Sequence, residues 1–262
     1  MLRFYSSVTV YFRLLPIDRY PVTNTTPEHP APKKQSPFID LIVSILLPSV
    51  ILMKLSGDDK LGPTGALILA LAFPVGWGLY DLAKNGTKNY VAILGVVSVL
   101  LTGSIGLLKL DAQWLAVKEA AIPLCIGLGI LIANFFGFPL IRKLLYNPTV
   151  MRIDRVDEAL ESRGNQEKFT QRLDRANTFF ACTFFFSAIA NYVLAKKIVV
   201  SESGTEEFNN ELGRMTLLSY PVIAIPSMIM MFAIFYYIWR TINTLTDLKL
   251  EQVIVGGEDA EK

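Results

Sequence analysis

Residues 112–136 read AQWLAVKEAAIPLCIGLGILIANFF, and this stretch decides the fold class. Its only charged residues are Lys118 and Glu119. A helix needs about 20 predominantly apolar residues to cross a hydrocarbon core roughly 30 Å thick. Because backbone groups in lipid must hydrogen-bond within their own segment, the stretch predicts a transmembrane helix.

Five more stretches share this character. Of the whole chain, 52% is hydrophobic and only 18% is charged, whereas a soluble domain carries about 25% charge. We therefore predict an all-α, polytopic membrane protein with six transmembrane helices in a membrane domain at 38–239. The predicted spans are 38–55, 62–82, 90–108, 112–136, 178–195 and 215–239.

The segments outside the spans are polar or rich in proline. Residues 1–37 predict a flexible cytoplasmic tail, with a mitochondrial targeting segment as the alternative because Arg3 and Arg13 precede any acid. The loop at 137–177 predicts two short amphipathic helices at the membrane surface, the first capped by Asp154 and ended by Gly164. Residues 240–262 form a predicted cytoplasmic C-terminal tail.

The distribution of basic residues predicts the orientation. Most of the 25 Lys and Arg residues fall in the N-terminal tail, in the loop at 137–177, between the second and third spans, and in the C-terminal tail. Lys and Arg collect in cytoplasmic loops. We therefore expect both termini in the cytoplasm and the acidic loop at 201–214 outside.

Lys118 and Glu119 are the first candidate polar site within a span. Ionisable groups in spans are costly and often mark a pathway or an ion pair. Adjacent residues point about 100° apart on a helix, so we expect that the two side chains do not face each other and that one of them meets a partner on another helix. The alternative is that both lie near the outer surface and reach water with their long side chains.

Further candidates are two prolines and two asparagines. Pro74 and Pro123 lie deepest in their spans and could kink the helices, as in transporter sites, although neighbouring helices often accommodate such kinks. Asn134 and Asn191 are expected to hydrogen-bond across helices. Pairs of glycines, such as Gly127 and Gly129, favour either a compact bundle or a homo-oligomer interface.

The loop at 137–177 mixes both signs of charge. Its basic edge, Arg142, Lys143, Arg152 and Arg155, is a candidate surface for anionic lipid headgroups. The interspersed acids argue against nucleic acid as a partner.

The sequence carries no recognisable catalytic motif, so we expect a protein that is not an enzyme. It has one histidine, His29, and no phosphate-binding loop, dinucleotide fingerprint, zinc-protease helix or nucleophile elbow. The two cysteines, Cys125 and Cys182, lie in apolar stretches and indicate no disulfide. We expect no cofactor and no metal site.

With this topology, residues 38–245 resemble a bacterial family, the inner-membrane intracellular septation protein A family. They are more similar to the larger, mostly uncharacterised membrane proteins related to it. The residues that carry the resemblance are Leu47-Pro48, Lys54-Leu55, Gly62-Pro63, the run from Ala66 to Pro74, Tyr80-Asp81, Leu101 to Gly103, Gly106 to Leu108, Trp114, Val117 to Ala120, Pro139 to Lys143, Ala188 to Asn191, Phe208-Asn209, Glu211 to Met215 and Ser219 to Pro221.

The resemblance implies a cell inner-membrane protein with a non-enzymatic accessory or scaffolding role in envelope maintenance or division. Its partners would be membrane lipids, with division or envelope proteins as further candidates. The alternative is a transporter or channel for a small solute or ion that uses Lys118, Glu119 and the kinks at Pro74 and Pro123.

Overall fold

A computed structural model describes residues 42–85, 90–145 and 151–255. Within these ranges the chain is helical and contains no β-strand beyond one isolated bridge between Met151 and Ile254. The predicted tail at 1–37 and residues 256–262 lie outside the described residues. All described helices belong to one compact unit of the chain.

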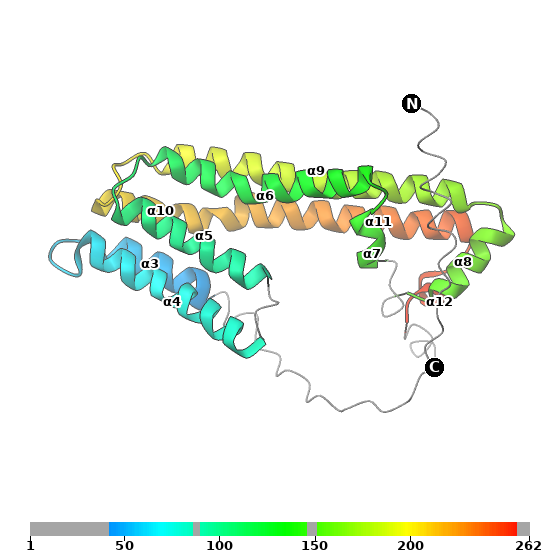
Figure 1. The fold of residues 1–262 in the computed structure, drawn as a ribbon, viewed down its shortest axis with the longest axis horizontal. Helices are drawn as coiled ribbons and strands as arrows, with labels where there is room; N and C mark the ends of the chain where they lie inside the picture. The colour runs from blue at the N-terminus through cyan, green and yellow to red at the C-terminus, as the bar shows by residue number, and fades with distance from the viewer. Residues whose placement is uncertain (1–41, 86–89, 146–150, 256–262) are drawn as a thin grey trace. The chain divides into compact units, whose positions relative to one another are not determined.

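Helices occur at all six predicted stretches (Figure 1). In chain order they are the π-helix η1 (Ile42–Leu46) with α3 (Leu47–Leu55), α4 (Gly62–Asn85), α5 (Tyr90–Leu107), α6 (Gln113–Phe135), α7 (Leu140–Leu145), α8 (Ile153–Ser162), α9 (Gln166–Ile198), α10 (Glu206–Ser219), the π-helix η2 (Tyr220–Ala224), α11 (Ile225–Thr246) and α12 (Leu250–Val253).

Four helical stretches are long and apolar enough to cross a membrane. They are Gly62–Tyr80, Gln113–Phe135, Gln166–Ile198 and Glu206–Thr246. The apolar part of α5, Ile93–Leu107, is shorter, and the first predicted span is described only from residue 42 onward. The described residues thus form an all-helical fold with the composition of a membrane protein.

Two expected helix boundaries are wrong. The loop expected up to residue 177 ends much earlier, because α9 begins at Gln166 and runs unbroken for 33 residues, about 50 Å at 1.5 Å per residue. Its polar first part contains the second predicted amphipathic helix. The loop expected at 201–214 likewise ends at Thr205, whose side-chain oxygen accepts a hydrogen bond from the Phe208 amide and caps α10.

The first amphipathic helix is confirmed as α8, with Val156 and Leu160 buried. Asp154 lies in its first turn but makes no cap, which corrects the prediction, and Arg152 holds the cap position. Gly164 ends the helix as expected, with a left-handed φ of +62° that favours glycine.

Two apolar cores hold the bundle together. One joins α6, α8, α9 and α11 through residues such as Val156, Leu173 and Ile238. The other joins α3, α4, α5, α6, α9 and α10, with Leu67, Leu115 and Phe208 almost fully buried. α6 packs mainly along α9, whereas α4 packs between α3 and α5.

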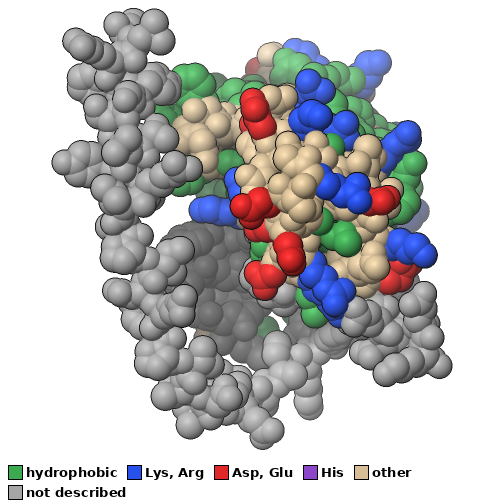
Figure 2. Space-filling view, turned by 90° about the vertical axis from the view of Figure 1, so that its right-hand side faces the viewer, with side chains coloured by type: hydrophobic (Ala, Val, Ile, Leu, Met, Phe, Trp, Pro, Cys, Tyr) green, Lys and Arg blue, Asp and Glu red, His purple; other side chains and the backbone are tan. Residues whose placement is uncertain are grey.

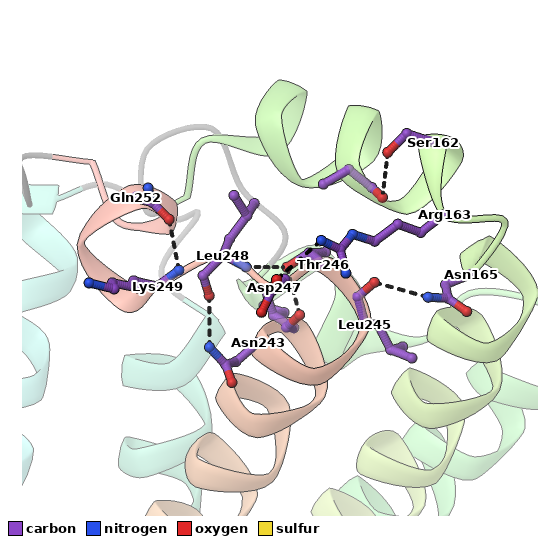
Figure 3. Close-up of polar contacts among 12 residues, drawn as sticks. Ser162, Arg163, Asn165, Asn243, Leu245, Thr246, Asp247, Leu248, Lys249 and Gln252 are labelled. Atoms are coloured by element: carbon purple, nitrogen blue, oxygen red, sulfur yellow. Dashed lines mark hydrogen bonds and ion pairs between the residues drawn. The ribbon is translucent and has the colours of Figure 1, made fainter.

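Hydrogen bonds join the start of α9 to the end of α11 (Figure 3). The Asn165 amide nitrogen donates to the Leu245 carbonyl at 3.0 Å, and Arg163 pairs with Asp247 at 3.2 Å. Asp247 ends α11 in the left-handed conformation, at φ +63°. These contacts close the end of the bundle that carries α8.

Gly213 allows α10 to lie close to α3. A Cβ at this position would lie 2.8 Å from the Met53 Cγ and 2.9 Å from the Ser49 carbonyl oxygen. We expect Gly213→Ala to lower the unfolding free energy in detergent by about 1–3 kcal/mol, because the backbone carbonyl cannot move aside cheaply.

The matched control is Gly129→Ala in the interior of α6, where a Cβ would meet nothing within 4 Å. It should leave the unfolding free energy unchanged or raise it by up to about 1 kcal/mol through helix propensity. Denaturant-induced unfolding of the two purified variants measures the difference. Equal stabilities would contradict the close approach of α10 and α3.

Candidate functional site

Five helices, α3, α4, α5, α6 and α10, converge on one cavity of about 190 Å³. Apolar residues form most of its wall, and the polar groups are an ion pair and four hydroxyls. The lining residues are Pro48, Ser49, Leu52, Ala70, Leu71, Pro74, Ser98, Val99, Thr102, Lys118, Glu119, Leu212, Met215 and Thr216. A mostly apolar cavity with a few convergent polar groups is typical of a small-molecule site.

Lys118 lies at the centre of the polar contacts. Its ammonium lies 2.7 Å from the Glu119 Oε1 and donates to the Thr102 hydroxyl at 2.7 Å. It also donates to the Ser98 hydroxyl at 3.2 Å and lies 3.4 Å from the Ser98 carbonyl oxygen. Only 11% of its side chain and 25% of the Glu119 side chain are exposed.

The ion pair corrects one expectation. The 100° between adjacent side chains does not keep Lys118 and Glu119 apart, because both chains are long and flexible enough to converge beside α5. The expectation that one of the two residues meets a partner on another helix is confirmed, because Lys118 donates to Ser98 and Thr102 on α5.

Lys118 does not reach toward the nearer end of its helix. Its Cα lies about 8 Å inside α6, and Ser98 lies about 13 Å inside the adjoining end of α5, at 1.5 Å per residue. A short turn at 108–112 joins these two helix ends. The ammonium is thus held at a depth between those of Thr102 and Ser98, so the geometry favours an interior site over a side chain that extends to surface water.

The hydroxyls of the cavity come from three helices, and sequence inspection missed them. Thr102 and Thr216 donate to carbonyls one turn earlier in their own helices, Ser98 at 3.2 Å and Leu212 at 2.9 Å. Ser49 on α3 is fully buried, and its hydroxyl has no partner among the described residues. Single hydroxyls in apolar helices give no signal in a sequence, because only the tertiary packing brings them together.

Of the two predicted kinks, one lies in the cavity wall. Pro74 has no amide hydrogen, so the carbonyl of Ala70, another residue of the cavity wall, lacks its usual donor four residues later. Pro123 deprives the Glu119 carbonyl in the same way, but Pro123 itself does not line the cavity.

The two predicted asparagines do not do what we expected. Asn191 donates at 2.8 Å to Ser187 in its own helix, and the buried Oδ1 of Asn134 has no partner in the described structure. Buried asparagines elsewhere do join separate elements. Asn177 accepts from the Ile141 amide at 3.1 Å, and Asn209 donates to Ser56 and to the Pro63 carbonyl at 2.9 and 2.7 Å.

The four basic candidates lie on two short helices, α7 and α8 with its N-cap position. Arg142 and Lys143 lie exposed on α7, where the Lys143 ammonium lies 5.6 Å from the centre of the Phe138 ring. Arg152 caps α8, and its backbone amide donates to the Val253 carbonyl at 2.8 Å, whereas Arg155 is exposed on α8. Figure 2 shows basic and acidic side chains intermixed on this face.

Glu211, expected in the acidic outer loop but located in α10, has a structural role. The Glu211 carboxylate accepts hydrogen bonds from the amides of Val200 and Ser201, both at 2.9 Å, and from the Ser201 hydroxyl at 2.8 Å. The described ranges contain no group of three or more His, Cys, Asp or Glu side chains placed to hold a metal ion.

Two further hollows are almost purely apolar. One, of about 360 Å³, lies between α5 and α6 and includes Trp114, with the Lys118 stem in its wall. The other, of about 280 Å³, lies between α9 and α11 beside Cys182. Neither gathers polar groups. A third hollow, of about 250 Å³, is lined by Asp111, Gln113 and Lys196 at the ends of α6 and α9. We take the five-helix cavity as the candidate functional site because it is lined by a largely buried ion pair.

Comparisons with protein families, with curated proteins and with solved structures find no match to this chain.

Proposed function

We propose that the protein is a multi-pass membrane protein of the cell inner membrane that carries a small polar solute through the five-helix cavity. The proposed topology has six spans with both termini in the cytoplasm. Four long apolar helices and the excess of basic residues in the predicted cytoplasmic segments support it. The observation that carries the transport proposal is the Lys118–Glu119 ion pair, which lines a cavity inside a helical bundle with an apolar surface.

The free-energy cost of burying two charges is the reason why the ion pair indicates a functional site. Two charges taken out of water gain at best about what their desolvation costs, and apolar side chains of the same size would often stabilise the fold more. A bundle that needed only packing would not require the pair. Charged groups that face a cavity in a membrane protein typically mark a solute or ion pathway.

The test is uptake into vesicles that contain the purified protein. The solutes are radiolabelled methylammonium, sodium, glycine and glycerol. At least one should enter about tenfold or more faster with the native protein than with the double variant Lys118→Met/Glu119→Leu, a factor that corresponds to about 1.4 kcal/mol. The control variant Ser104→Ala, on an exposed position of α5, should match the native rate.

Equal uptake of all four solutes by the native protein and the double variant would contradict transport through this cavity. A transport mechanism also has to make the cavity accessible from both sides in turn. Pro74, where α4 lacks a hydrogen bond, is a suitable hinge in the cavity wall.

The accessory role implied by the family resemblance stays a second proposal. The mixed-charge face around α8 is a surface that could contact lipid headgroups or an envelope protein (Figure 2). Crosslinking in native membranes tests it: co-purification of division or envelope-synthesis proteins would support a scaffold, and recovery of the chain alone or as a homo-oligomer would count against it.

A further inference from the structure

Most side-chain hydrogen-bond donors of the cavity are in use, and only the hydroxyl hydrogens of Ser49 and Ser98 have no acceptor among the described residues. The three hydrogens of the Lys118 ammonium face Glu119, Thr102 and Ser98. The hydroxyl hydrogens of Thr102 and Thr216 are directed to backbone carbonyls. Few protein N–H or O–H groups therefore remain to donate a hydrogen bond to a ligand in the cavity.

Acceptors, in contrast, are left over. Glu119 uses one carboxylate oxygen for Lys118, and no described group contacts the other. The Ser49 hydroxyl is fully buried and unpartnered within the described structure. The Ala70 carbonyl lacks its helical donor because of Pro74. All three residues line the same cavity, but Ser49 and Ala70 are fully buried, so a ligand reaches their oxygens only when the cavity wall shifts.

Resting on the proposed function, we infer that the solute is a small cation that carries N–H donors, a primary ammonium of the methylammonium class. It would donate to the second oxygen of Glu119, to the Ser49 hydroxyl and to the Ala70 carbonyl. The Lys118 ammonium lies beside α5 and pairs with one oxygen of the Glu119 carboxylate. The second carboxylate oxygen is then the negatively charged atom that would meet the ligand.

Two observations narrow the chemical class of the ligand. No aromatic side chain of the described residues lines the cavity, whereas quaternary ammonium groups, which have no N–H, are usually bound by aromatic cages. The volume of about 190 Å³ accommodates a ligand of about the size of benzene and excludes much larger ones. Sodium ions prefer a fuller shell of oxygens than these three groups provide.

The test is binding by titration calorimetry to the full-length protein in phosphatidylcholine nanodiscs. The ligands are methylammonium, tetramethylammonium, sodium and acetate as simple salts, with glycerol as the neutral solute. We expect methylammonium to bind at least about tenfold more tightly than the others, since charged hydrogen bonds are the strong ones. Glu119→Gln should weaken its binding about tenfold or more, because the acceptor loses its charge.

The variant Pro74→Ala tests the role of the Ala70 carbonyl specifically. Alanine restores an amide hydrogen for the Ala70 carbonyl, so the helix should become more regular while methylammonium binding weakens severalfold. Ser104→Ala, whose hydroxyl bonds to Leu100 in its own helix, is the control and should bind as the native protein does.

The outcomes separate the two proposals. Tighter binding of tetramethylammonium, acetate, glycerol or sodium would overturn the inference about the ligand and leave transport through the cavity standing. Methylammonium binding that is unchanged in both Glu119→Gln and Pro74→Ala would also overturn it. No binding and no uptake of any solute would overturn both proposals.

Discussion

Replacing Lys118 by methionine should lower the unfolding free energy by about 3 kcal/mol, the low end of the range for breaking a buried ion pair. The variant leaves the Glu119 carboxylate in the cavity without its counter-charge, and leaves the hydroxyls of Ser98 and Thr102 without their shared donor. The loss of unfolding free energy should stay near this lower value because 25% of the Glu119 side chain is exposed, so water can partly solvate the unpaired carboxylate.

The double variant Lys118→Met/Glu119→Leu should recover most of that loss. Both charges are then absent, and apolar replacements of similar volume often match or exceed the stability of a buried pair. Uptake and methylammonium binding should nevertheless remain lost in the double variant. Denaturant-induced unfolding in detergent measures the first effect, and a native-like stability of Lys118→Met would show that the pair is not formed.

Asn177→Leu is expected to have the second largest effect, a loss of about 1–3 kcal/mol. The fully buried Asn177 Oδ1 accepts from the Ile141 amide, which lies in the first turn of α7 and has no partner within that helix. Leucine of nearly the same size fills the space but leaves this amide buried without an acceptor.

Asn191→Leu is the matched control for that prediction, because the same residue type lies in the same helix. Asn191 donates only to Ser187 in α9, so its loss leaves no group on another helix unpaired. The change in unfolding free energy should stay within about 0.5 kcal/mol. Equal losses in the two variants would contradict the role of Asn177 in holding α7 against α9.

The positions of the apolar helices could be predicted from the sequence, but two of their ends could not. The apolar run of α9 begins near residue 178, and hydropathy alone therefore hides its polar first three turns. A better signal was present: no glycine or proline occurs from Gln166 to Ile198, so nothing in the sequence interrupts the helix. Thr205, a capping residue before two glutamates, marked the start of α10 in the same way.

The candidate site was only half predictable. Lys118, Glu119 and Pro74 stand out because ionisable groups and prolines are costly inside apolar helices. Ser49, Ser98 and Thr216 do not stand out, since a hydroxyl is easily accommodated by its own helix. Their convergence depends on how α3, α5 and α10 pack around α4, which no local pattern encodes.

The asparagines likewise show that tertiary packing decides which polar side chains join separate elements. Asn134 and Asn191 attracted attention because they lie within apolar runs, yet the fully buried asparagines are Asn177 and Asn209 at the edges of such runs. At these edges, loops and short helices leave backbone groups that need a partner, and a buried amide side chain supplies it.

The most direct test of the central claim is water access to the middle of α5. Ser98 lines the cavity about 12 Å from one end of this helix and about 13 Å from the other, whereas Leu100, two residues later, has 54% of its surface exposed on the outside of the bundle. Ser98→Cys and Leu100→Cys, in a protein whose Cys125 and Cys182 are replaced by alanine, would be treated in vesicles with a small, membrane-impermeant thiol reagent. A polar solute pathway predicts that the cysteine at position 98 reacts readily and the one at position 100 does not. An inert cysteine at position 98, or equal reaction at both positions, would contradict a solute site in this cavity.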